Sequence, residues 1–490
     1  MHDSIAAAGW RFNNSYARLP ETLFAASQPA PVRSPAVVVV NEPLAADLGL
    51  DPTILRVHGA GVFAGNEIPP GAEPIAQAYA GHQFGHFTNL GDGRAILLGE
   101  QITPNKQRCD IQLKGAGRTR YSRGGDGRAA IGPMLREYIV SEGMHALGIP
   151  TTRSLAVATT GELVLRNAPL AGAVLTRVAA SHIRVGTFQF AAAVEDDRLL
   201  PALLHHAIAR HDPTAAEAAD PALAFFAGVV ERQAVLVARW MLVGFVHGVM
   251  NTDNMAVSGE TIDYGPCAFL DAYDPATVFS SIDQQGRYAY ANQPGIAHWN
   301  LARLAESLLP LVRGGEDESL EAVRSVLATF PERFDRQYLA GARAKLGLVT
   351  EEVGDRDLFT ALLRSMHEAQ ADFTATFARL ANVAESRAAS ASDATAPGLR
   401  EWQAAWLARL ERQPGTPAEA AARMRQVNPV VIPRNHRVEE ALSAAESGDV
   451  GPLHRLLAAL RDPFVETKAN ERYRGGPPAS CGAYRTFCGT

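Results

Sequence analysis

One segment of the chain, residues 225–249, is apolar on nearly every face of the helix that it predicts. Val229, Leu236, Trp240 and Phe245 belong to a surface that is not divided into a polar and an apolar side. A helix of this kind is stable in water only when other elements surround it. The segment therefore predicts a central helix in a large lobe built from other parts of the chain.

The chain before this helix has a different pattern from the chain after it. Between residues 91 and 178, short runs of Val, Ile and Leu are bounded by Gly, Pro or Asn, which is typical of strands joined by turns. The expected strands are residues 36–40, 94–98, 109–114, 154–158, 163–165 and 173–178. The expected helices, besides the apolar one, are Ile131–Ala146, 299–312 and 358–380. Strands followed by helices predict an α+β fold in two lobes with a ligand cleft between them.

Composition and charge limit the classes of function. Of the 490 residues, 47% are hydrophobic and 20% are charged, which is ordinary for a globular protein with a large core. The formal net charge of -6 argues against a nucleic-acid partner. No apolar run is long enough to predict a membrane span, and the N-terminus lacks the pattern of a secretory signal. We therefore expect a cytoplasmic protein with neither nucleic-acid nor membrane partners.

Two signals in the strand-rich part indicate phosphate binding. Gly91, Gly93 and Arg94 form a turn in which the glycines let the backbone approach a phosphate and the arginine supplies charge. The same Gly-Asp-Gly pattern is also a common hairpin turn. Lys114 ends a strand pattern, and Glu137 follows it on the expected helix. Such a pair can hold nucleotide oxyanions as in kinases, although a solvated strand end and a favourable helix-start glutamate are plainer explanations.

The strongest signal directly follows the apolar helix. His247, Asn254 and Asp263 are separated by seven and nine residues, and Asp263 begins an Asp-Tyr-Gly turn. This is the kinase spacing of the catalytic-loop His, the metal-binding Asn and the Asp of the Asp-Phe-Gly turn. Asn254 and Asp263 offer the hard oxygens that Mg²⁺ prefers, and a polar hairpin loop would not explain the spacing. Val249 occupies the position of the usual kinase base and cannot accept a proton, so Asp253 is the nearest carboxylate.

A glycine- and arginine-rich segment follows Lys114, where ordinary kinases have no insert. It spans residues 115–138 and contains six glycines. Its arginines are residues 118, 120, 123, 128 and 136, and Arg177 and Arg184 are further cationic candidates. Backbone N–H groups and guanidinium groups together can hold phosphates, whereas the alternative is a solvated basic loop.

Taken in order, these motifs resemble the selenoprotein O family of pseudokinase-like protein adenylyltransferases over nearly the whole chain. The matching segments are residues 79–100, 110–138, 148–156, 247–255, 262–266 and 428–436. The resemblance implies a protein-kinase-like two-lobed fold with terminal extensions. The expected parts are an N-terminal extension at 1–85, a strand-rich N-lobe at 86–195, a helical C-lobe at 196–385 and a C-terminal helical extension with a cysteine-containing tail at 386–490.

The resemblance also implies an activity. ATP would bind in a flipped orientation, and AMP would pass from its α-phosphate to a Ser, Thr or Tyr hydroxyl of a protein, with Mg²⁺, or Mn²⁺ through the same oxygen ligands. By motif, Lys114 and Glu137 would form an ion pair, Asn254 and Asp263 would hold the metal, and Asp253 would be the general base. The expected nucleotide contacts are Gly91, Gly93, Arg94, Lys114, Asp126, Gly127, Arg177, Arg184 and Asp263. A γ-phosphoryl transferase and a non-catalytic nucleotide-binding pseudokinase remain alternatives.

The cysteines predict redox regulation. Some members of the family carry selenocysteine near the C-terminus, whereas this chain resembles bacterial members with cysteine there, at Cys488. Cys481 and Cys488 form a thiol pair in the tail, for which two incidental thiols are an equal alternative. Cys267 lies four residues after Asp263, where an activation-type loop would begin. We expect that Cys481 or Cys488 can form a disulfide with Cys267 and restrain that loop.

Overall fold

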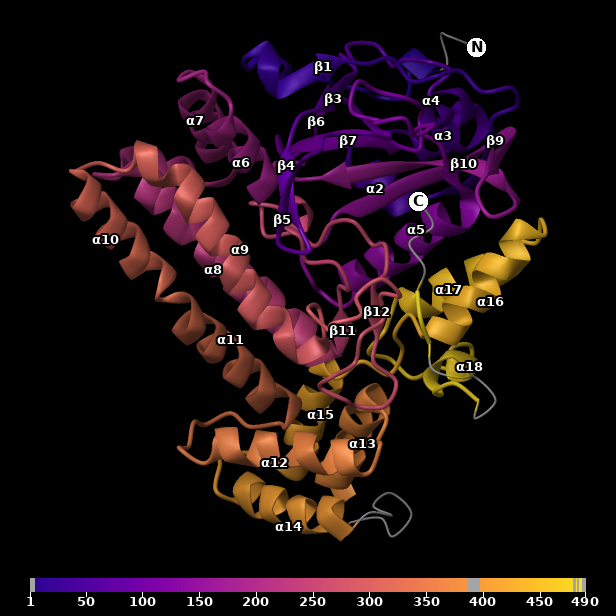
Figure 1. Cartoon of the computed structure of the whole chain (residues 1–490). Coiled ribbons are helices and arrows are strands. Elements are labelled where there is room, and N and C mark those ends of the chain that lie inside the picture. The colour runs from indigo at the N-terminus through magenta and orange to yellow at the C-terminus, as the bar shows by residue number, and fades with distance from the viewer. Residues whose placement is uncertain (1–4, 387–396, 479–481, 483, 487–490) are drawn as a thin grey trace.

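The structure is a computed structural model that describes residues 5–386, 397–478, 482 and 484–486. Most strands lie before residue 180 and most long helices lie after it, so the expected α+β fold is confirmed (Figure 1). The strands are β1 Phe24–Ala26, β2 Ala36–Val40, β3 Ile75–Gln77, β4 Ala80–Gln83, β5 His86–Asn89, β6 Ala95–Ile102, β7 Arg108–Lys114, β8 Ala129–Ala130, β9 Arg153–Leu165, β10 Pro169–Ala179, β11 Phe245–Val246 and β12 Ala268–Phe269.

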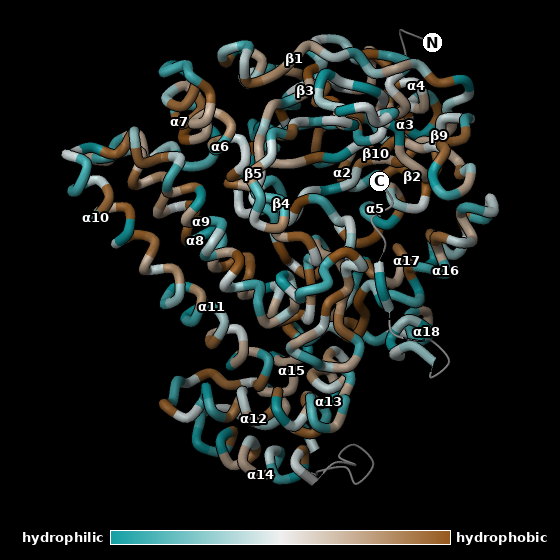
Figure 2. The backbone as a smooth tube through the Cα atoms, viewed as in Figure 1, coloured by the Kyte–Doolittle hydropathy of each residue, from teal (hydrophilic) through white to brown (hydrophobic). Residues whose placement is uncertain are grey.

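The helices begin before the sheet is complete and continue to the end of the chain. They are α2 Glu42–Asp47, α3 Pro52–His58, α4 Ala60–Ala64, α5 Ile131–Ala146, α6 Val185–Ala193, α7 Leu199–His211, α8 Pro221–Val243, α9 Gln293–Leu308, α10 Glu316–Leu327, α11 Phe330–Lys345, α12 Asp355–Glu368, α13 Phe373–Ser386, α14 Pro397–Glu411, α15 Pro417–Val427, α16 Asn435–Glu446, α17 Gly451–Leu460 and α18 Glu471–Arg474. In Figure 2, hydrophilic and hydrophobic positions alternate along α11 and α12, as expected of helices with one buried face.

One eight-stranded antiparallel sheet organises the first part of the chain. Its order is β1-β3-β6-β7-β10-β9-β2, and β8 pairs with β10. In this register Lys114 lies opposite Leu175, and Arg177 lies opposite Gln112. Residues that lie opposite each other, and residues two apart along a strand, share a face of the sheet. Lys114 and Arg177 therefore project from the same face.

Helices cover both faces of this sheet. The short helices α2 to α4 pack on one face, where Leu55 and Phe63 join Ile111 and Leu113 in an apolar cluster. Helix α5 packs on the other face, and α16 and α17 from the end of the chain pack behind it. Because α5 carries Glu137, this packing fixes that carboxylate against the sheet face from which Lys114 projects.

The apolar segment forms the central helix of the second part, as expected. Helix α8 is surrounded by α9, α10 and α11. By length and hydropathy it meets the criteria of a membrane-spanning helix, and 56% of its most apolar window is buried within the protein. The expected end at residue 249 is wrong. Gly244, with φ +72°, ends the helix in a left-handed cap, and Phe245–Val246 then form β11.

Two other expected elements are also corrected. The strands expected at 154–158 and 163–165 are one strand, β9, because β10 pairs with both halves and a bulge absorbs the interruption. The helix expected at 358–380 is two helices, α12 and α13. Asp372 separates them: its carboxylate accepts a hydrogen bond from the N–H of Ala375 and forms an ion pair with Arg434.

The remaining expectations agree with the structure in place and type. Strand β2 and helix α5 have the expected bounds. The strands expected at 94–98, 109–114 and 173–178 are the longer strands β6, β7 and β10. The helix expected at 299–312 is α9, which begins earlier and ends in a short 3-10 turn at Leu309–Leu311.

Candidate active site

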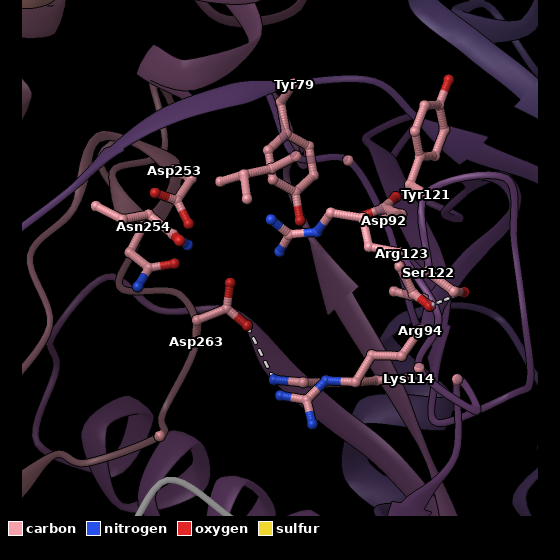
Figure 3. A pocket seen from close by; sticks show the side chains of 18 of the residues that line it. Tyr79, Asp92, Arg94, Lys114, Tyr121, Ser122, Arg123, Asp253, Asn254 and Asp263 are labelled. Carbon is pink, nitrogen blue, oxygen red and sulfur yellow. Dashed lines mark hydrogen bonds and ion pairs between the residues drawn. The ribbon is translucent and has the colours of Figure 1, made fainter. Parts of the chain in front are cut away.

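A cavity of about 720 Å³ lies where the sheet meets the segment that follows α8. The fold thus brings together residues that are far apart in the sequence (Figure 3). Its lining includes Gly91, Gly93, Arg94, Lys114, Asp126, Gly127, Arg177, Arg184, Val249, Asp253, Asn254 and Asp263. Every residue expected to contact a nucleotide or a metal therefore faces one space, whereas Glu137 lies behind Lys114.

An ion cluster forms the inner wall of the cavity. Lys114 Nζ lies 2.7 Å from Glu137 Oε2 and 2.9 Å from Asp263 Oδ1. Arg177 bridges the same two carboxylates, at 2.7 Å from Nε to Glu137 Oε1 and 2.7 Å from Nη2 to Asp263 Oδ1. Sheet, α5 and the turn after β11 thus meet through four charged side chains. The ion pair expected between Lys114 and Glu137 is present.

The cations determine the charge state of the carboxylates. Burial alone would raise the pKa of Asp263, but Arg177, Lys114 and Arg184 outweigh it and hold the pKa well below its usual range. The pKa of Glu137 is lowered in the same way, with burial opposed by Arg177 and Lys114. Both side chains are therefore carboxylates at neutral pH, so they balance the charges of Lys114 and Arg177, and a further cation is needed to attract a phosphate.

Arg184 adds a third cation to the inner wall of the cavity. It is the residue before α6, where its N–H donates to Thr187 Oγ1 at 3.0 Å. Its Nη2 lies 3.7 Å from Asp263 Oδ2 and 4.0 Å from Asp92 Oδ1. The guanidinium also lies over the ring of Tyr79, 4.3 Å from the centroid. A planar cation held between an aromatic ring and carboxylates is well placed to bind a phosphate.

Asp253 differs from the other carboxylates of the cavity. It lies on a short 3-10 turn, Thr252–Asn254, and its Oδ1 is buried without a hydrogen-bond partner among the described residues. Burial raises the pKa of Asp253 to about 6, although Arg184 opposes the shift. A positioned carboxyl with a free oxygen and a pKa near neutrality is suited to accept a proton.

Main-chain hydrogen bonds hold the turn that carries Asp253. The hairpin of β4 and β5 contacts this turn, and the N–H of His82 on β4 donates to Thr252 Oγ1 at 2.7 Å. The N–H of Phe84 donates to Asn251 Oδ1 at 3.1 Å. The hairpin therefore fixes residues 251–253 from the side opposite the ion cluster.

The side-chain oxygen atoms of Asn254 and Asp263 are ligands of the kind that a hard divalent cation prefers. Asn254 uses its amide nitrogen to donate to the carbonyl of Val249 at 3.0 Å, which leaves its oxygen as the available ligand. Asp263 Oδ2 accepts no hydrogen bond from the described residues and lies 3.7 Å from Arg184 Nη2. Within the described residues no group of three or more His, Cys, Asp or Glu side chains forms a metal site. One or two side-chain oxygens completed by substrate phosphates is the usual arrangement for Mg²⁺.

The glycine- and arginine-rich segment closes the cavity over the Gly91–Gly93 turn. Thr119 Oγ1 donates to the carbonyl of Asp92 at 2.5 Å, and Ser122 Oγ donates to the carbonyl of Gly93. Tyr121 packs so closely that a Cβ on Gly91 would lie 2.4 Å from its ring. The glycine at position 91 is therefore required by this packing, a reason that the phosphate motif does not supply.

The other members of the segment have different roles. Of its arginines, 118, 123 and 128 line the cavity. Asp126 also lies on the wall, where its carboxylate forms an ion pair with Arg166 at 2.8 Å. Arg136 points elsewhere, because its Nη2 donates to the carbonyl of Cys267 and its Nη1 to Glu439, both at 2.9 Å.

Only part of the expected redox site is described. Cys481 and Cys488 lie outside the described residues. Cys267 is a free, fully buried thiol, and burial raises its pKa to about 12 although Arg136 opposes the shift. The described tail does reach this region, since Thr486 Oγ1 donates to the carbonyl of Pro266 at 3.0 Å. A disulfide with Cys267 stays a prediction.

Several residues of the cavity carried no sequence prediction of a role. They are Tyr79, Gln83, Asp92, Tyr121, Ser122, Arg166 and Asn251. Tyr79 is the first residue of the Tyr-Ala-Gly-His-Gln-Phe-Gly-His motif, so the motif was visible although its contact with Arg184 was not. Asp92 lies between the two glycines of the turn. Only the folded structure shows that it lines the cavity.

Comparisons with known proteins identify the family of the chain. The family model described as protein adenylyltransferase SelO matches residues 8–461. A protein nucleotidyltransferase YdiU of Geobacillus kaustophilus (strain HTA426) is 58% identical over 485 residues, which cover 99% of this chain and 100% of the relative. One of the same name from Rhizobium etli (strain CIAT 652) is 56% identical over 490 residues, with 99% and 98% covered. The chain therefore belongs to the SelO family of protein adenylyltransferases.

Proposed function

We propose that this protein transfers AMP from ATP to Ser, Thr or Tyr hydroxyls of other proteins in the cytoplasm. The observation that most supports this proposal is that Val249 and Asp253 line the same cavity. Val249 lies where a protein kinase has its base, and Asp253 offers a buried carboxyl oxygen without a partner. The arrangement of Lys114, Glu137, Asn254 and Asp263 favours a protein-kinase-like fold whose base has changed position.

The distribution of cations favours a flipped nucleotide. Positive groups line two regions of the cavity: the inner cluster with Lys114 and Arg177, and the glycine- and arginine-rich segment with Arg118, Arg123 and Arg128. In our proposal the terminal phosphates face that segment. The α-phosphate then lies near Asp263 and Asp253, where an acceptor hydroxyl can reach it. The cavity volume of about 720 Å³ is within the range of nucleotide-sized sites.

The proposed reaction follows from these positions. The acceptor oxygen attacks the α-phosphorus while Asp253 takes the hydroxyl proton. The bond from the α-phosphorus to the oxygen that bridges to the β-phosphate breaks, and pyrophosphate leaves with the electron pair. Lys114, Arg177 and Arg184 stabilise the charge that develops on the phosphate oxygens. A Mg²⁺ ion, held by Asn254 and Asp263, would supply further charge neutralisation, and Mn²⁺ accepts the same ligands.

The rival activity is γ-phosphoryl transfer, and ATP labelled separately at the α- and γ-phosphates distinguishes the two. We expect label in protein from the α position alone, in the presence of Mg²⁺. Label from the γ position alone would show a phosphotransferase and contradict the role of Asp253. Nucleotide binding without label in any protein would indicate a non-catalytic pseudokinase.

A further inference from the structure

A second cavity, of about 730 Å³, adjoins the first. Phe84 and Ile282 line both cavities, so these two side chains form the boundary between them. The walls of the second cavity come from the β4–β5 hairpin, the segment 282–287 and the first turn of α9. None of the residues expected from the sequence to bind nucleotide or metal lines it. A ligand in this second cavity would therefore lie beside the nucleotide.

The boundary residue Phe84 is held in an unfavourable conformation. Its φ of +51° is in the left-handed region, which non-glycine residues rarely adopt, and Gly85 follows with φ +90°. The N–H bond to Asn251 and the packing of its ring 5.1 Å from the Tyr288 ring hold it there. Tyr288 donates to the same Asn251 oxygen at 2.5 Å. Strained residues fixed by their surroundings are concentrated at ligand sites.

The charge available in the second cavity is positive. The Asp283 carboxylate is already used, because it accepts hydrogen bonds from the N–H groups of Arg287 and Tyr288 at 3.0 and 2.8 Å. Arg287 lies over the rings of Trp299 and Tyr288, 4.9 and 5.7 Å from their centroids, and among the described residues it forms no ion pair with a carboxylate. Its buried Nε finds no acceptor in the part of the chain that the structure describes. A carboxylate from a ligand would complete this site.

We infer that the second cavity binds the acceptor protein, through the segment that carries the hydroxyl and an acidic residue beside it. The inference rests on the proposed function. The hydroxyl-bearing side chain passes between Phe84 and Ile282 to reach Asp253, and the acidic neighbour pairs with Arg287. The boundary side chain Ile282 is apolar and 55% exposed, as is common where proteins bind.

Transfer of α-labelled AMP to synthetic peptides tests the inference. Each peptide has one central Ser, Thr or Tyr, flanked by glutamates in one set and by lysines in the other. The wild-type protein should modify the glutamate set with a kcat/KM roughly five-fold higher, the upper end of what an exposed ion pair provides. R287E should reverse the preference, because its new carboxylate repels the glutamates and attracts the lysines. The dissociation constant of ATP should stay unchanged in R287E.

Two further variants separate binding from misfolding. Arg303 also lies over the Trp299 ring at 4.9 Å but does not line the cavity, so R303E should keep the wild-type preference. I282S changes an exposed side chain and should raise the KM for both peptide sets with little change in the KM for ATP. Equal use of the two peptide sets by wild type and R287E, with I282S unchanged, would overturn the inference while leaving AMP transfer intact. Absence of label from every acceptor, lysate proteins included, would overturn the proposed function and the inference with it.

Discussion

The position of the Asp253 carboxylate can be tested through a residue that carries no side chain. Gly81, on β4, packs directly against Asp253. A Cβ at Gly81 would lie 2.2 Å from Asp253 Oδ1, 2.8 Å from its Cγ and 2.9 Å from its Cβ. Gly81 does not have a positive φ, so alanine is compatible with its backbone. The variant Gly81→Ala should therefore displace the carboxylate without straining the chain at position 81.

The size of the effect follows from these distances. Ordinary contact between a carbon and an oxygen requires more than 3 Å, so the carboxylate must move by about 1 Å. A displacement of about 1 Å at a reacting group can lower a rate about 10²-fold. We expect kcat for AMP transfer to fall by about this factor. The dissociation constant of ATP should change little, because the ion cluster is not touched.

Single-turnover transfer from α-labelled ATP, with ATP binding measured by calorimetry, gives both quantities. Gly354→Ala is the matched control, since a Cβ there meets nothing within 4 Å and its φ is −79°. In an Asp253→Ala background, Gly81→Ala should have no further effect, because both changes act on the same group. A full 10²-fold loss in that background, or full activity of Gly81→Ala alone, would refute the reasoning.

Three other changes have defined outcomes. Asp263→Ala should abolish metal-dependent transfer, and activity restored by excess Mg²⁺ would contradict its role as a ligand. Glu137→Gln leaves Lys114 and Arg177 to share one carboxylate, so unfolding in urea should show a loss of about 3–5 kcal/mol, and an unchanged midpoint would argue against the cluster. Burial lowers the pKa of Lys345 to about 7, so the unfolded state binds more protons above that pH and stability should rise with pH. Between pH 7 and 9 the wild type should gain about 1–3 kcal/mol that Lys345→Met does not, and parallel pH profiles would exclude this.

The parts of the site that could be read from the sequence are those with short-range patterns. The spacing of Asn254 and Asp263 is set within one turn and hairpin, and Lys114 ends a strand whose pattern is local. Gly244 marked the end of α8, and only the apolar run beyond it concealed this. Local sequence patterns were therefore sufficient to select Lys114, Asn254 and Asp263 as candidate site residues.

The remaining features depend on contacts between distant segments. His82 meets Thr252 across 170 positions, and nothing in either local pattern indicates the pairing. The break between α12 and α13 is fixed by Arg434, 62 positions away from Asp372. The packing of Tyr121 on Gly91 joins two segments that lie 30 positions apart in the sequence. Such contacts follow from the tertiary fold, so a sequence pattern alone does not predict them.

The hairpin that holds the Asp253 turn does so with main-chain donors. The N–H groups of His82 and Phe84 belong to the main chain, and only at Phe84 does the side chain also hold the conformation, through its ring contact with Tyr288. The other side chains of the hairpin can therefore change by mutation while the turn that carries Asp253 keeps its position. His86 of the hairpin lines the proposed acceptor site, so target preference can evolve there without displacing the proposed base.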